Sequence, residues 1–99
     1  MLHLLLLTFT GAPEDAAPYT AAHMEYLERH YGAGTFLAYG PTVPASVGGG
    51  IIARGVGREE VERITSEDPF VAAGVISYAI TTIDLAQAHP ALADLLAGS

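Results

Sequence analysis

Residues 19–31 read YTAAHMEYLERHY, and this stretch decides the fold that the sequence predicts. At roughly 100° per residue, several of its apolar and aromatic side chains and both of its histidines fall on one side of a helix. Its charged side chains point mainly elsewhere. His23 lies in the middle of this apolar stripe, so we expect its ring to face the protein interior. The stripe consists of Tyr19, His23, Tyr26, Leu27 and His30.

An inward histidine raises the question of its partner, and the sequence offers Asp68 in the motif Asp68-Pro69-Phe70. If the two meet, His23 can act as a general base or acid whose charged form the carboxylate favours. The alternative is a core histidine bonded to a backbone carbonyl group. Asp68 also has an alternative role, because an aspartate directly before proline is typical of a helix N-cap. Both roles can hold, since a capping carboxylate keeps lone pairs for an imidazole.

The composition predicts one compact domain. With 99 residues, of which 51% are hydrophobic and 15% are charged, the chain can bury one core. We expect a single domain over residues 1–99, with a core at about 2–84 and a C-terminal tail at 85–99. A domain of this size must share core residues with its site or complete the site with another subunit, which favours a homodimer.

The charge balance limits the partners. Eleven acidic residues against four arginines and no lysine give a formal net charge of −7 at pH 7. Such a surface repels phosphate backbones and anionic lipids, so we expect neither a nucleic-acid partner nor a membrane-surface role. No cysteine is present, which excludes disulfide bonds, thiol nucleophiles and cysteine-based zinc sites. His23 and His30 are i and i+7, whereas zinc-binding helices use i and i+4, so no metal site is predicted.

Residues 2–9 form a nearly continuous apolar run. The run is too short to span a bilayer, and it has neither a basic leading region nor an obvious cleavage site. We interpret it as a strand of a cytoplasmic protein, central in a sheet and buried on both faces.

The remaining elements follow in an order that indicates the fold class. A connecting loop at 11–18 precedes the helix at 19–31, which Gly32 and Gly34 end. Strands are expected at 35–39, 47–54 and 74–84, a second helix at 58–66, and a weak helical turn at 91–96. This β-α-β-β-α-β order predicts an α+β, ferredoxin-like fold, in which both helices lie on one face of an antiparallel sheet. A second copy's sheet would cover the other face.

Three successive glycines, Gly48 to Gly50, open the third strand. Because glycines weaken a strand, they indicate a bulge, the close approach of another backbone, or room for a ligand. They match no phosphate-binding fingerprint, since they precede a strand and no lysine follows. A small-molecule site here would include Gly49, with Ser46 at its mouth and Tyr39 and Phe70 on its walls. The alternatives are an ordinary loop serine and ordinary core aromatic residues.

Four pieces of the chain form an ordered pattern that covers nearly its whole length. They are His23-Met24-Glu25-Tyr26-Leu27, Ala38-Tyr39-Gly40-Pro41, the glycines before Ile51-Ile52, and Asp68-Pro69-Phe70 followed by Gly74. This pattern resembles that of the YCII-related (YciI-like) proteins. The resemblance implies a dimeric α+β barrel of ferredoxin-like halves, with a cleft in which His23 and Asp68 match the histidine and aspartate of an active site.

The resemblance also implies a range of activities. The family includes a dehydrochlorinase that acts on a chlorinated hydroxyquinol, and other members occur as partners of larger proteins. Many relatives carry an arginine three residues before the histidine, where this chain has Thr20. A cationic anchor for an anionic substrate is therefore missing at that position.

Two hypotheses about function follow. In the first, the chain is a small lyase-type enzyme without a cofactor, in which His23, oriented by Asp68, moves a proton on a small aromatic or carbonyl-containing substrate. Elimination needs only a base, a positioned leaving group and a dry pocket. In the second, the chain is a non-catalytic ligand-binding or protein-interaction module that uses the same dimer cleft. A purely structural protein is a third, less favoured alternative.

Overall fold

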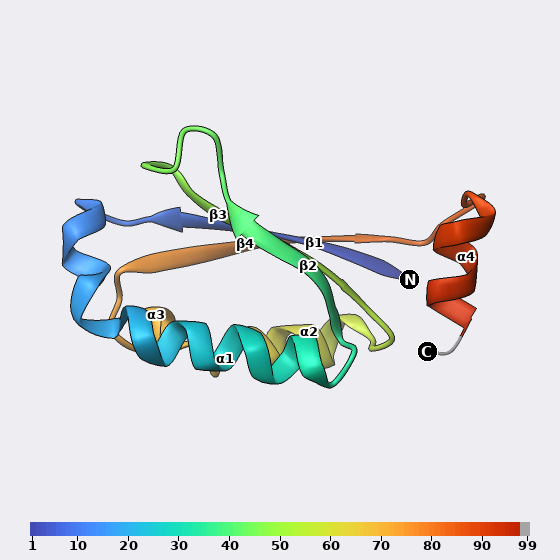
Figure 1. The fold of residues 1–99 in the computed structure, drawn as a ribbon, viewed down its shortest axis with the longest axis horizontal. Helices are drawn as coiled ribbons and strands as arrows, with labels where there is room; N and C mark the ends of the chain where they lie inside the picture. The colour runs from blue at the N-terminus through green and yellow to red at the C-terminus, as the bar shows by residue number, and fades with distance from the viewer. Residues whose placement is uncertain (98–99) are drawn as a thin grey trace.

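The computed structural model describes residues 1–97 as a four-stranded antiparallel sheet with helices on one face (Figure 1). The α1, α2 and α3 helices lie on that face, and α4 stands at one end of the sheet. No helix within this range is long and apolar enough to cross a membrane. The elements are β1 (Leu2–Phe9), the 3₁₀ helix η1 (Pro13–Tyr19), α1 (Thr20–Gly32), β2 (Phe36–Pro41), β3 (Gly48–Arg54), α2 (Arg58–Thr65), α3 (Pro69–Ala72), β4 (Ile76–Ile83) and α4 (Pro90–Ala97).

The strand order is β2-β3-β1-β4, so β1 lies in the interior of the sheet as predicted. Its side chains alternate, because successive residues of a strand point to opposite faces. Leu5 and Leu7 are buried on the helix-covered face, whereas Leu4 and Leu6 on the other face are 37% and 55% exposed. Within one chain, β1 is therefore buried on one face, and the expected cover of its other face by a second copy stays a prediction. The helices cover only one face of the sheet.

The segment between β1 and α1 is more ordered than predicted. Instead of a loop at 11–18, the chain forms η1, with Pro13 in its first turn and Ala16 buried. Proline suits the first turn because its fixed φ angle is helical and its missing N–H is not needed there. Tyr19 ends η1 and is 41% exposed, so it lies outside the buried stripe of α1.

The core fills the space between the sheet and the helices. The predicted inward side chains of α1, Tyr26 and Leu27, are buried there, as are Val61 and Ile64 of α2. The rings of Tyr26 and Phe36 meet edge to face, with centroids 5.8 Å apart. This packing fixes α1 against the sheet, and α1 carries His23.

Gly48 marks a close approach between two backbones, one of the three roles expected of the glycine run. It pairs with Thr8 of β1 and has a φ of +155°. A Cβ atom added at Gly48 would lie 1.8 Å from the carbonyl oxygen of Leu7. Only glycine fits between β3 and β1 at this point.

Substitution of Gly48 with alanine is expected to lower the free energy of unfolding by at least about 2 kcal/mol, because the backbone must move or adopt strained dihedral angles. Urea unfolding followed by circular dichroism measures this loss. Gly50→Ala is the matched control, since an added Cβ atom there meets nothing closer than 3.9 Å. Equal losses in the two variants would contradict the close approach at Gly48.

Candidate active site

His23 faces the interior from the buried side of α1, as predicted. The residue is 8% exposed, and its Nδ1 atom lies 2.8 Å from Oδ1 of Asp68. Its ring stacks on the ring of Phe70, with centroids 3.9 Å apart and planes inclined by 9°. The hydrogen bond and the stacking together fix both the position and the plane of the imidazole.

Asp68 is fully buried and serves as the N-cap of α3. Its Oδ1 atom accepts the backbone N–H of Phe70 at 2.9 Å, in addition to the bond with His23. The cap and the contact with His23, which the sequence left as separate interpretations, thus coexist in one carboxylate. The short α3 helix begins where it does because Asp68 caps it and Pro69 occupies its first position.

The hydrogen bond to Asp68 determines how neutral His23 carries its proton. A carboxylate accepts, so Nδ1 donates, and Nε2 is left with a lone pair. Within residues 1–97, no buried side-chain nitrogen or oxygen lacks a hydrogen-bond partner, and Nε2 forms no such bond. Nε2 therefore lies at an accessible surface, with its lone pair available to a ligand.

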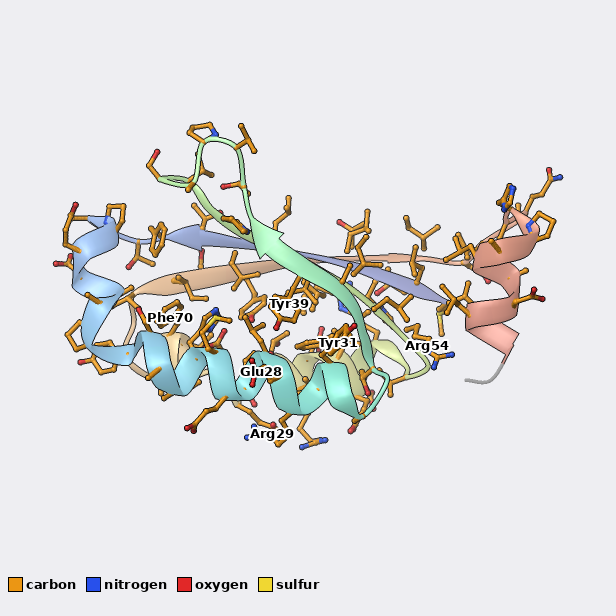
Figure 2. All side chains as sticks on the ribbon, in the orientation of Figure 1. Glu28, Arg29, Tyr31, Tyr39, Arg54 and Phe70 are labelled. Carbon is orange, nitrogen blue, oxygen red and sulfur yellow. The ribbon has the colours of Figure 1, made fainter. Side chains whose placement is uncertain are left out.

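His23 lines a cavity of about 520 Å³ between η1, α1 and the β2–β3 hairpin. Four predicted site residues line it, namely His23, Tyr39, Gly49 and Phe70. Figure 2 shows Tyr39 and Phe70 in the space between the sheet and α1. Ser46 lies in the exposed turn before β3, outside the lining, and its role stays a prediction.

The cavity is mostly apolar and has no cationic side chain in its lining. Thr20, at the position where an arginine was expected by resemblance, lines the cavity and directs its hydroxyl group to the carbonyl oxygen of Ala16 at 3.4 Å. Arg29 points from α1 away from the sheet, as Figure 2 shows. The site therefore favours an uncharged ligand over a strongly anionic one.

Comparison with known protein families places the chain in one of them. The sequence profile of the YCII-related domain matches residues 1–92. The chain belongs to the YCII-related family. The resemblance that the four sequence pieces indicated is thus confirmed over nearly the whole chain. No curated protein matches the sequence.

A solved structure has a similar fold. It is 5-chloro-2-hydroxyhydroquinone dehydrochlorinase (TftG) from Burkholderia phenoliruptrix AC1100, in complex with 2,5-dihydroxybenzoquinone. The TM-score is 0.72 at 23% sequence identity, and the match covers 85% of this YCII-related domain and 94% of TftG. This likeness confirms an α+β fold with an antiparallel sheet.

Two tyrosines of the YCII-related domain extend the site, and the sequence did not reveal their role. The hydroxyl group of Tyr78 in β4 donates to Oδ2 of Asp68 at 2.7 Å. The hydroxyl oxygens of Tyr78 and Tyr26 are 3.4 Å apart. Strand alternation places Tyr78 on the same face as Ile76 and Ile80, which was the one available signal. Strand alternation indicates which face the Tyr78 side chain lies on, but not which residue it contacts.

The two tyrosines are expected to make stability fall at alkaline pH. Burial raises the pKa of Tyr78 and of Tyr26 above the ordinary value of 10.0. The folded state then keeps protons that the unfolded chain loses, so the tyrosine contribution is complete below pH 10 and declines above it. The decline approaches about 1.4 kcal/mol per pH unit for each tyrosine. Urea unfolding at about pH 8 and pH 11 should give a smaller difference in Tyr26→Phe than in wild type, and equal differences would contradict the shift.

The other histidines of the YCII-related domain have structural partners. His3 is fully buried, and its Nε2 atom lies 2.6 Å from the carbonyl oxygen of Val56. His30 contacts Glu67 at 2.9 Å, and His89 accepts the N–H of Ala91 at the start of α4. No group of three side chains within residues 1–97 is arranged to bind a metal ion.

Proposed function

We propose that this YCII-related domain is a lyase-type enzyme in which His23 moves a proton on a small, uncharged ring substrate. One observation carries the proposal: Nδ1 of His23 is held by a buried carboxylate, while the residue lines an apolar cavity. We place the free Nε2 atom toward that cavity. A histidine with that environment is a general base aimed at a bound molecule.

The reaction follows from this geometry. In the keto tautomer of a chlorinated hydroquinone, the carbon that carries chlorine is tetrahedral. The lone pair of Nε2 takes a proton from a ring hydroxyl group, and the electron pair of the broken O–H bond forms a C=O bond. The adjacent ring double bond shifts to the carbon that carries chlorine, and chloride leaves with the electrons of the C–Cl bond, which gives a quinone. The negative charge of Asp68 stabilises the imidazolium, which then returns its proton to solvent. The apolar lining strengthens these electrostatic interactions by excluding water.

The cavity supports a single-ring substrate. Its volume is in the range of small-molecule sites, and the aromatic rings of Tyr39 and Phe70 offer flat surfaces for stacking. The TftG structure holds 2,5-dihydroxybenzoquinone, a single-ring compound of this size class. We propose Tyr39, Gly49 and Phe70 as contact residues, and Ser46 as a hydrogen-bond donor at the mouth.

The test uses a panel of chlorinated hydroquinones with the wild-type protein. Chloride release measures elimination, and ¹H–¹⁵N spectra measure binding through the signals of Gly49 and Gly50. Release of chloride together with perturbation of these signals supports the proposal. Perturbation without any release would favour a non-catalytic ligand-binding module. Absence of both would count against a small aromatic ligand.

We also infer that two ferredoxin-like copies pair through the uncovered sheet face, forming a dimeric α+β barrel. Leu4 and Ile52 face each other across β1 and β3, and Leu6 lies beside them. All three are substantially exposed and line a groove of about 460 Å³. A second sheet would remove this apolar surface from water.

Sedimentation equilibrium tests the pairing. We expect wild type at twice the chain mass of 10.3 kDa and Leu6→Glu at the single mass, because a carboxylate would be buried at the interface. Ala22→Glu is the control, since Ala22 is exposed on α1, on the opposite side of the sheet from the proposed interface, and its substitution should leave the dimer intact. A wild-type monomer would refute the pairing.

A further inference from the structure

The carboxylate of Asp68 is held from three directions. His23 of α1 and the backbone of Phe70 donate to Oδ1, at 2.8 and 2.9 Å. Tyr78 of β4 donates to Oδ2 at 2.7 Å. Since Asp68 is fully buried, these protein donors take the place of water around its charge.

The donor to Oδ2 comes from a different element than the donors to Oδ1. Rotation of the carboxylate about its Cβ–Cγ bond moves both oxygens, so a bond to either oxygen resists it. The bond from Tyr78 in β4 adds a restraint on Oδ2 to the two bonds on Oδ1, and the three together hold Oδ1 directed toward Nδ1 of His23.

We propose that Tyr78 is a positioning residue, which holds the carboxylate of Asp68 in the orientation that keeps the His23 ring aimed at the cavity. The inference rests on the proposed function for its catalytic meaning. Tyr78 is absent from the cavity lining, so it acts through Asp68 and touches no substrate there. Tyr78 thus affects the orientation and charge distribution of the dyad formed by His23 and Asp68.

Tyr78 is suited to remain a donor throughout the working pH range. Burial raises the pKa of its hydroxyl group, and the nearby Tyr26 and Asp68 raise it further. The phenol therefore keeps its proton around neutral pH, and it remains a donor to Oδ2 there.

The test compares Tyr78→Phe with Tyr26→Phe, each of which removes one hydroxyl group and keeps the ring. The readout is the Nδ1–H resonance of His23, followed by ¹H–¹⁵N spectroscopy of histidine-labelled protein. We expect the resonance to shift and broaden in Tyr78→Phe, because the carboxylate gains rotational freedom. We expect little change in Tyr26→Phe, which leaves the bond between Tyr78 and Asp68 intact. An unchanged resonance in folded Tyr78→Phe, or equal changes in both variants, would overturn the proposal.

A measurement on the wild type covers the case in which Tyr78→Phe does not fold. The hydroxyl proton of Tyr78 should exchange slowly and show a cross-peak to the Nδ1–H proton of His23, because both point at one carboxylate. A rapidly exchanging Tyr78 hydroxyl proton would likewise overturn the proposal.

Kinetics separates this inference from the proposed function. With a substrate from the hydroquinone panel, Tyr78→Phe should lower kcat by about ten- to a hundredfold while KM changes little. If the His23 resonance shifts in Tyr78→Phe but the wild-type protein turns over no substrate, the proposed enzymatic function is refuted and the positioning of Asp68 by Tyr78 still holds. Full activity in Tyr78→Phe would refute the positioning role and retain the enzyme.

Discussion

Replacement of His23 with glutamine is expected to lower kcat/KM by about a hundred- to ten-thousandfold, the usual contribution of general acid–base catalysis. Glutamine preserves a hydrogen-bond donor toward Asp68, but its amide cannot take up a proton from the substrate. The loss should fall mainly on kcat, since the cavity walls remain in place. Steady-state chloride release, measured after circular dichroism has confirmed the fold, provides the comparison with wild type.

His30→Gln is the matched control for this experiment. His30 lies two turns further along α1, contacts Glu67 and does not line the cavity. Its substitution should leave kcat/KM within about twofold of wild type, because substitutions away from the reacting groups have only small effects. Comparable activity in His23→Gln and wild type would remove His23 from the reaction.

Substitution of Asp68 with alanine is expected to lower the free energy of unfolding by about 3–5 kcal/mol, the cost of removing one partner from a buried polar cluster. Three donors lose their acceptor at once, on His23, Phe70 and Tyr78. Domains of this kind are stable by only about 5–15 kcal/mol, so a large share of the total would disappear. Urea denaturation at neutral pH measures the difference.

Asp68→Asn separates the stability lost with the α3 cap from the stability lost with the contacts to His23 and Tyr78. Asparagine is as good an N-cap as aspartate and can accept the same N–H groups, so α3 should remain capped. A smaller loss than in the alanine variant is therefore expected. If Asp68→Ala itself lost only about 1 kcal/mol, the usual cost of a lost cap, then the contacts with His23 and Tyr78 would add nothing to stability.

The sequence suggested the pairing of His23 with Asp68, and the family resemblance matched both residues to an active site, but their contact is a tertiary property that local patterns do not show. Helical periodicity fixes the direction of His23, and the Asp-Pro sequence fixes the start of α3. Tyr78 lacked such a signal. Strand alternation puts it on the same face as Ile76 and Ile80, but its contact with Asp68 depends on how β4 and α3 pack, which is a tertiary property.

One feature of the fold was mispredicted, and a second was predicted only in part within one chain. Residues 11–18 combine glycine, prolines and acidic residues, which are typical of loops and equally of a 3₁₀ helix that begins at proline. In β1, the apolar run indicates burial on both faces, and a single chain covers only one of them. Local sequence patterns thus predicted the strands and helices, but they could not show what covers the second face of the sheet.

Asp68 has two roles, as the cap of α3 and as the partner of His23, and this limits which substitutions the position tolerates. Because one carboxylate both caps α3 and holds the histidine, selection for a stable fold preserves it independently of selection for chemistry. Under the proposed function, a change at His23 would remove the base and leave the cap of α3 in place, whereas a change at Asp68 would disturb the fold and the base together.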